Sequence, residues 1–161
     1  VMGIDRNMGL AYAKSQIAAG NAIPQGGTVF LSLNDRDKQK MGSLGKDLVA
    51  LGFRIEATNG TAALLRAQGI EVDEIYKVGE GRPNVVDRII NGKIQWIINT
   101  PYGVESKYDE RAIRRTALEY GLPTMTTLAA AQAGILAIRA MREDTCHLYA
   151  IQEYHAGLAG K

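Results

Sequence analysis

Cysteine and histidine are nearly absent from this chain of 161 residues. The single cysteine, Cys146, excludes an internal disulfide and a zinc site built from several cysteines, and it favours a reducing, cytoplasmic location. Both histidines, His147 and His155, lie near the C-terminus. Cys146 and His147 are adjacent, and adjacent side chains of an extended chain point to opposite sides. The sequence therefore gives little support to cysteine–histidine catalysis or to a metal site.

The chain also lacks a strong charge, basic clusters and long apolar runs. Its 19 Lys and Arg residues against 17 Asp and Glu residues give a net charge of +2, and Arg114–Arg115 is the longest basic run. This balance argues against a nucleic acid or membrane partner. The apolar runs are too short to span a bilayer, and no signal peptide is recognisable. With 46% hydrophobic residues, the composition is that of one globular domain.

Strand-like runs alternate with helical runs from residue 28 to residue 142, and short links that contain glycine separate them. This alternation predicts a parallel sheet with helices on both faces. We therefore predict an α/β domain with three layers, α/β/α, around a five-stranded, mainly parallel sheet. The predicted strands are 28–33, 53–57, 72–77, 94–98 and 124–126. The first predicted helix of the domain follows the turn at 34–37 and ends near residue 51. The other predicted helices cover about 61–68, 83–91, 109–120 and 128–141.

Two further segments flank this domain. Residues 1–27 contain a predicted helix at 7–19 and end in a linker rich in Pro and Gly. Because the chain starts at Val1 rather than at methionine, we expect this lead-in to continue from a preceding unit of a longer protein. Residues 143–161 are expected to form a tail, with a strand at 147–151 and a loose end.

The stretch Gly52–Thr61 combines a strand, a polar turn and the start of a helix. The alternating residues 53–57 give way to a Thr-Asn-Gly-Thr turn at 58–61, and an apolar helical run follows at once. A helix N-terminus has unpaired N–H donors and a partial positive charge, so it readily receives phosphate or carboxylate. The alternative is that Thr58 or Asn59 only caps the helix. Both interpretations stay open on this stretch alone.

Polar residues also follow the neighbouring strands. The turn Asn34–Asp37 offers side chains that cap the next helix. Lys38 and Lys77 are placed to reach the two threonines at 58–61, and together these groups would neutralise and hydrogen-bond a phosphate monoester. Asn99–Thr100 ends the most apolar strand, where the Asn would contact a base or sugar or would form an Asx turn. Since ligands bind at the carboxyl ends of parallel strands, we expect these turns to converge.

Glycine-rich loops of the nucleotide-binding kinds are absent. No Gly-x-x-x-x-Gly-Lys-[Ser/Thr] pattern occurs, which excludes the usual NTPase loop. The run Gly79–Pro83 lies between a strand and a helix but lacks the Gly-x-Gly-x-x-Gly spacing of dinucleotide-binding folds. It is typical of a structural turn, with Pro83 expected in the first turn of the helix.

Several motifs in order resemble the C-terminal regulatory domain of carbamoyl phosphate synthase large subunits. The motifs are Phe-Arg-Ile-Glu-Ala-Thr-Asn-Gly-Thr-Ala, Val-Gly-Glu-Gly-Arg-Pro-Asn-Val-Val-Asp-Arg-Ile, Trp-Ile-Ile-Asn-Thr-Pro and Ile-Arg-Arg-Thr-Ala-Leu-Glu-Tyr. The resemblance runs from Gly27 to the end and implies the methylglyoxal-synthase-like fold, which is Rossmann-like. The segment at 1–17 resembles the stretch that leaves the second ATP-grasp synthetase unit in that family.

The resemblance implies that the chain binds nucleoside monophosphates, since bacterial members are inhibited by UMP and activated by IMP. The implied phosphate contacts are Lys38, Thr58, Asn59, Gly60, Thr61 and Lys77. The residues implied on the ribose and base side are Ser32, Asn99 and Thr100. Asn59 stands where relatives often have His, a change that should leave the phosphate contacts intact. Some members also respond to ornithine through a Tyr and a Thr; Thr126 matches the Thr, but Thr124 occupies the Tyr position.

The resemblance also implies a parent enzyme, a ligase that makes carbamoyl phosphate from bicarbonate, glutamine and ATP for pyrimidine and arginine synthesis. ATP and Mg²⁺ or Mn²⁺ would serve the parent, and no cofactor is expected in these 161 residues. The implied partners are the nucleotide effector, the synthetase domains of the same large subunit, the glutaminase small subunit and, as an option, a second copy.

Two alternatives remain. A lyase of the methylglyoxal synthase type needs a carboxylate base near its substrate carbon. That family supplies one Asp after the glycine turn and another in a Trp-Asp-Pro segment, whereas this chain has neither, and its nearest acids are Glu80 and Asp87. We therefore expect no catalytic residue in this chain. The other alternative is an oligomerisation module, a role that is compatible with regulation.

Overall fold

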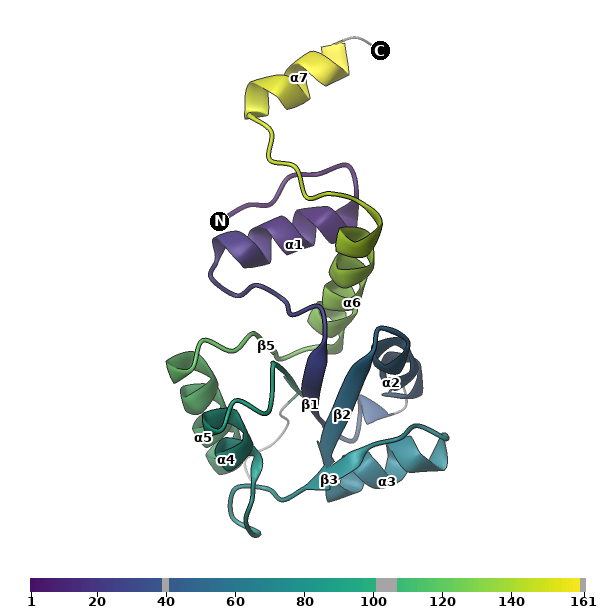
Figure 1. Cartoon of the computed structure of the whole chain (residues 1–161), viewed down its shortest axis with the longest axis vertical. Coiled ribbons are helices and arrows are strands. Elements are labelled where there is room, and N and C mark those ends of the chain that lie inside the picture. Colours follow the sequence, from purple (N-terminus) through teal and green to yellow (C-terminus); the bar gives the residue numbers. More distant parts are fainter. Residues whose placement is uncertain (39–40, 101–106, 160–161) are drawn as a thin grey trace.

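The computed structural model describes residues 1–38, 41–100 and 107–159 and contains a five-stranded sheet (Figure 1). The strands are β1 (Gly27–Leu33), β2 (Phe53–Thr58), β3 (Asp73–Ile75), β4 (Trp96–Thr100) and β5 (Thr124–Met125). Their order is β3-β2-β1-β4-β5, and every neighbouring pair is parallel. The predicted fold class is confirmed, with a sheet that is parallel throughout these strands.

Helices cover both faces of the sheet (Figure 1). On one face lie α2 (Met41–Ala50), α3 (Asn59–Ala67) and α6 (Leu128–Glu143). On the other face lie α4 (Val85–Ile90) and α5 (Lys107–Glu119). Two further helices, α1 (Met8–Ala18) and α7 (Ile151–Ala159), lie at the end of the molecule away from the sheet.

The pleat of the strands divides the core into two parts. Successive side chains of a strand point to opposite faces, so Leu31 and Ile98 join the cluster under α2, α3 and α6, whereas Phe30 and Ile97 join the cluster under α4 and α5. Phe30 and Ile97 are partners in the β1–β4 register, as are Leu31 and Ile98. All four are fully buried, as expected for strands covered on both faces.

The order of the strands reverses at β1, and this reversal positions the site. The chain passes from β1 outward to β2 and β3, then crosses back to β4 on the other side of β1. Helices that leave adjacent strands toward opposite faces open a crevice at the carboxyl ends of those strands. The β1–β4 register pairs Ser32 with Asn99 and Leu33 with Thr100 at this edge. The predicted convergence of polar turns is therefore confirmed for these two strands.

Two predicted boundaries around the third strand are wrong. β3 ends at Ile75 rather than at residue 77, so Lys77 lies beyond the strand. The next helix starts at Val85, and Pro83 lies outside it. The reason is a capping box: the Asn84 side chain accepts hydrogen bonds from the N–H groups of Val86 and Asp87, and the Asp87 carboxylate accepts one from the Asn84 N–H.

The lead-in helix α1 packs closely on α6. A Cβ atom at Gly9 would lie only 2.5 Å from the carbonyl oxygen of Leu136, so the absence of a side chain there lets the two helices approach. Leu10 and Ala13 of α1 are buried. The predicted helix at 7–19 is confirmed, with Asn7 as its N-cap. The division of the chain at residues 27 and 142 stays a prediction.

The tail differs from the expectation. Residues 145–150 form no strand, and a helix, α7, begins at Ile151 in place of the loose end. The Glu153 carboxylate accepts a hydrogen bond from the Ala150 N–H, which stabilises the start of this helix. The segment before it runs beside α1 rather than along a sheet edge, and Tyr149 stacks edge-to-face on Tyr154 with ring centroids 5.7 Å apart.

Candidate functional site

A cavity of about 400 Å³ lies at the carboxyl ends of β1, β2 and β4. It brings together eight of the residues that the sequence predicts for the site, and four more, three of which belong to the turn at 34–37 that was expected at this edge. The predicted residues are Ser32, Lys38, Thr58, Gly60, Thr61, Lys77, Asn99 and Thr100. The additional residues are Leu33, Asn34, Asp35 and Arg36. The cavity is therefore lined mainly by hydroxyl, amide and cationic groups.

The two threonines at the start of α3 have different hydrogen bonds. Thr58 is the N-cap residue in an extended conformation, but its side chain makes no capping hydrogen bond. The Thr61 hydroxyl accepts a hydrogen bond from the buried Leu33 N–H at 3.4 Å and so links α3 to β1. The capping interpretation of Thr58 is thus not supported by its side-chain contacts. Its hydroxyl stays available at a helix end that attracts anions.

Each lysine of the cavity has a carboxylate partner three residues away. Lys38 pairs with the exposed Asp35, and its hydrogen bond lowers the pKa of that carboxyl below the ordinary value. Lys77 Nζ lies 3.6 Å from an oxygen of Glu80. A Cβ atom at Gly60 would lie 3.8 Å from Lys38 Nζ, so this ammonium is close to the first turn of α3. Two cations therefore flank the start of the helix.

Asn34 forms a wall of the cavity; the turn that contains it was expected at this edge of the sheet, but the contact of Asn34 with Thr100 was not. Its side-chain oxygen accepts hydrogen bonds from the N–H groups of Arg36 and Asp37, which makes an Asx turn rather than a helix cap. Its amide nitrogen donates to the Thr100 hydroxyl at 3.1 Å and to Asp37 at 2.7 Å. Thr100 is therefore engaged in linking β4 to the turn after β1. The Asn that follows β1 was the available signal.

Two predicted residues lie away from the cavity. The Asn59 side chain donates a 2.7 Å hydrogen bond to Glu74 and does not line the cavity. This contact lowers the pKa of Glu74, and Arg66 acts in the same direction. Thr126 is exposed just past β5 and is also not a lining residue.

Carboxylates are scarce among the described residues that line the cavity. Asp35 is the only one, and it is exposed and paired with Lys38. Glu80 faces Lys77, and Asp87 is used in the capping box of α4. Within the described part of the chain, no three His, Cys, Asp or Glu residues are grouped in a way that could hold a metal ion. The arrangement can bind an anion through hydroxyls and cations.

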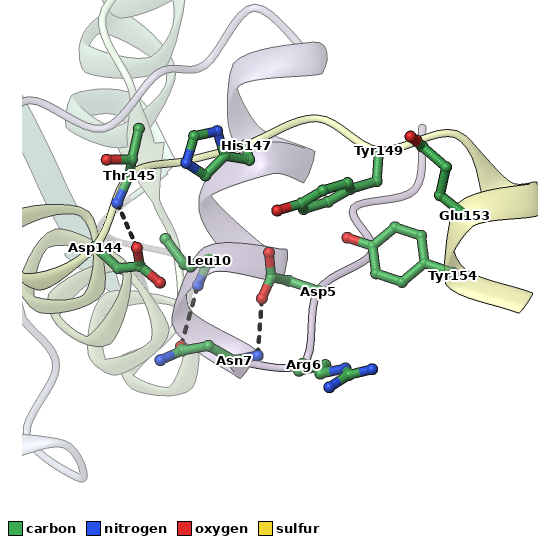
Figure 2. A pocket seen from close by; sticks show the side chains of 10 residues that line it. All are labelled: Asp5, Arg6, Asn7, Leu10, Asp144, Thr145, His147, Tyr149, Glu153 and Tyr154. Atoms are coloured by element: carbon green, nitrogen blue, oxygen red, sulfur yellow. Dashed lines mark hydrogen bonds between the residues drawn. The ribbon is translucent and has the colours of Figure 1, made fainter. Parts of the chain in front are cut away.

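A second cavity, of about 410 Å³, lies between the N-terminal segment and the tail, where Tyr149 and Tyr154 lie beside Asp5 (Figure 2). The Lys14 ammonium is buried nearby and bonds Asp5 at 2.6 Å. This hydrogen bond lowers the pKa of Asp5. Burial acts to lower the pKa of Lys14, but hydrogen bonds to Asp5 and Tyr154 raise it overall. Tyr154 also donates to the Ile4 carbonyl at 2.8 Å, which fastens the tail to the start of the chain.

The strand order, with a polar cavity at the carboxyl ends of the central strands, defines a doubly wound α/β domain. The chain belongs to the family of MGS-like domains, whose family model matches residues 40–126. In the described ranges, none of the helices is long and apolar enough to cross a membrane.

Relatives found by sequence include large chains of one enzyme. The chain is 48% identical, over its full length, to 15% of the carbamoyl phosphate synthase large chain of Acidobacterium capsulatum. It is 47% identical over 154 residues to the large chain of Nostoc, where it covers 14% of the relative. It is 46% identical over 143 residues to the C-terminal section of the large chain of Aquifex aeolicus, and there it covers 27%. The chain thus spans only a small part of these relatives.

Proposed function

We propose that this chain is the allosteric regulatory domain of a carbamoyl phosphate synthase large chain. The cavity at the carboxyl ends of β1, β2 and β4 would receive the phosphate of a nucleoside monophosphate, UMP or IMP. The observation that carries the proposal is the juxtaposition of Thr58, Lys38 and Lys77 at the N-terminus of α3. Hydroxyl donors, two ammonium groups and a helix dipole all favour a phosphate dianion.

The ribose and base would lie toward β1 and β4. Ser32 and Asn99 are register partners and both line the cavity, so their hydroxyl and amide are placed side by side. An amide offers both donors and an acceptor, which suits a base edge or a sugar hydroxyl. Thr100 supports this wall through Asn34 rather than offering a free hydroxyl. Asn59, which points to Glu74, is left out of the proposed phosphate contacts.

Regulation requires a partner whose activity depends on the bound state. The proposed partner is the remainder of the large chain, a ligase that would use ATP with Mg²⁺ or Mn²⁺ and receive ammonia from a glutaminase small subunit. A nucleotide would change the rate of that enzyme only if it binds one arrangement of the domains better than the other. Thr126, exposed past β5, is the residue we assign to an ornithine site at the junction with the synthetase domains.

The alternative lyase function has less support. Proton abstraction needs a carboxylate within hydrogen-bond reach of the substrate carbon. Asp35 is the single carboxylate among the described lining residues, and its pairing with Lys38 and its exposure do not suit a base in a closed site. A binding role for the cavity is therefore preferred.

Calorimetric titration with UMP and with IMP tests the proposal. Lys77→Ala removes a cation of the cavity, and Lys93→Ala removes an exposed lysine that does not line it. Loss of one charge-assisted hydrogen bond costs about 1.5–3 kcal/mol, which is about tenfold or more in affinity. Saturable binding that only Lys77→Ala weakens would support the proposal. No binding of either nucleotide, or equal effects of the two substitutions, would contradict it.

A further inference from the structure

A buried carboxylate lies in the sheet beneath the proposed effector site. Glu56 of β2 is only 3% exposed, and in the register it lies between Phe30 of β1 and Asp73 of β3. Phe30 belongs to the apolar cluster under α4 and α5, so Glu56 occupies a row that is otherwise suited to apolar side chains. A buried carboxylate next to a second carboxylate is unfavourable unless a cation and hydrogen bonds compensate it.

Arg88 of α4 supplies this compensation. Its Nε donates to one carboxylate oxygen of Glu56 at 3.0 Å, and its Nη2 donates to the other. The pair is therefore bidentate, which fixes the orientation of both side chains more strictly than a single contact does. The hydrogen bond to Glu56 raises the pKa of Arg88, and the charge of Asp73 acts in the same direction.

The two ends of this ion pair are connected to two walls of the cavity. Glu56 precedes Thr58 by two residues on β2. Arg88 lies on α4, whose N-cap Asn84 forms a β-bridge with Tyr76 and donates its side-chain amide to the Val78 carbonyl at 3.4 Å. Lys77 lies between Tyr76 and Val78. The position of α4 therefore fixes the segment that carries Lys77.

We propose that Glu56 and Arg88 are positioning residues that hold the Lys77 wall at the correct separation from the threonine wall of the cavity. The proposal rests on the proposed function, because the quantity that the pair controls is the affinity for the effector phosphate. Neither residue lines the cavity, so neither contacts the ligand. We expect loss of the pair to lower the affinity about tenfold, the lower end of what supporting hydrogen-bond partners contribute at metal sites.

The experiment compares Arg88→Met with Arg139→Met in the full 161-residue chain. Arg139 pairs with Asp47 across α6 and α2 and does not line the cavity, so it is an arginine–carboxylate pair elsewhere in the fold, although a more exposed one. Affinities for UMP and IMP are measured by calorimetry, and melting temperatures by circular dichroism. Arg88→Met should lower both the affinity and the melting temperature, whereas Arg139→Met should leave the affinity unchanged.

A double variant, Glu56→Gln with Arg88→Met, separates position from stability. It removes the uncompensated buried charge, so its melting temperature should recover relative to Arg88→Met alone. Its affinity should stay low, because the bidentate contact between β2 and α4 is still absent. The positioning role would be overturned if the affinity of the double variant recovered together with its melting temperature. It would also be overturned if Arg88→Met and Arg139→Met lowered the affinity equally. Either result would leave the proposed function standing. No nucleotide binding by the unmodified chain would instead overturn the proposed function and this proposal with it.

Discussion

Thr58 and Thr61 lie three residues apart at the start of α3, and replacing each with Val should have different consequences. Valine has nearly the shape of threonine but lacks the hydroxyl. The Thr61 hydroxyl is the hydrogen-bond acceptor of the buried Leu33 N–H, whereas the Thr58 side chain makes no capping hydrogen bond. If both hydroxyls also bind the effector phosphate, both variants should lose affinity, but only Thr61→Val should lose substantial stability.

The magnitudes follow from the partners that each substitution leaves behind. Thr61→Val leaves the Leu33 N–H unpaired in the interior, which costs about 1–3 kcal/mol of the free energy of unfolding. For a domain of this size, each kcal/mol lowers the melting temperature by about 2–4 °C. Thr58→Val should change the free energy of unfolding by no more than about 0.5 kcal/mol. Each missing hydroxyl should lower the affinity for UMP or IMP about tenfold, because each hydroxyl is proposed to donate a hydrogen bond to the charged phosphate.

Urea unfolding and calorimetric titration of the two variants measure both quantities in the same samples. Thr145→Val is the control for the substitution itself, because Thr145 is exposed and lies outside the proposed effector cavity. It should change neither stability nor affinity. The reasoning would be refuted if Thr58→Val lost as much stability as Thr61→Val, since its hydroxyl would then be a structural cap. It would also be refuted if Thr58→Val bound nucleotide as tightly as the unmodified chain.

Three further substitutions test the charges and the core. Asp35→Asn removes the partner of Lys38 and should raise the affinity for phosphate about two- to fivefold, measured by calorimetry. Gly134→Ala places a Cβ atom 2.8 Å from Trp96, so overpacking of about 1–3 kcal/mol should outweigh a helix gain of about 1 kcal/mol and lower the unfolding midpoint. Asp5 has a lowered pKa, so its stabilisation exists above its unfolded pKa near 3.8 and is lost as pH falls through the lower folded pKa. Asp5→Asn should therefore lower the melting temperature at about pH 7 but not at about pH 2.

Most of the sheet could be predicted because the central strands β1, β2 and β4 are largely buried, and because links that contain glycine separate many of the strands and helices. The third strand was predicted too long, because the sequence pattern runs to residue 77 whereas only three residues pair with β2. The two residues that follow Ile75 are exposed. The prediction for the tail was wrong because residues 147–151 have a composition typical of a strand, yet in the described part of the chain they pair with no strand. Contacts of Tyr149 and Tyr154 with the region around Lys14, over 130 positions away in the chain, cannot be inferred from local sequence.

The site was more predictable than its supporting structure. Strand-end turns must meet at one edge of a parallel sheet, so the positions of Thr58, Lys38 and Lys77 followed from order alone. Which way a side chain points within a turn depends on partners that are distant in sequence. Asn59 turns to Glu74, and Asn34 turns to Thr100, and neither contact has a local signature. The effector roles of the cavity residues stay predictions until binding is measured.

The acids that pair with the two lysines of the cavity bear on which anions the cavity can select. Lys38 and Lys77 are each paired with a carboxylate, Asp35 and Glu80. A ligand must compete with both carboxylates for the two ammonium groups. A phosphate monoester carries close to two negative charges at neutral pH and has three acceptor oxygens, whereas a carboxylate carries one charge and two oxygens. Only the phosphate can replace both acids at once and still accept hydrogen bonds from a threonine hydroxyl and the end of the helix. Internal competition of this kind lowers the affinity for every anion, but it lowers the affinity for singly charged ions the most, and so it favours a phosphate monoester over an ion with a single carboxylate.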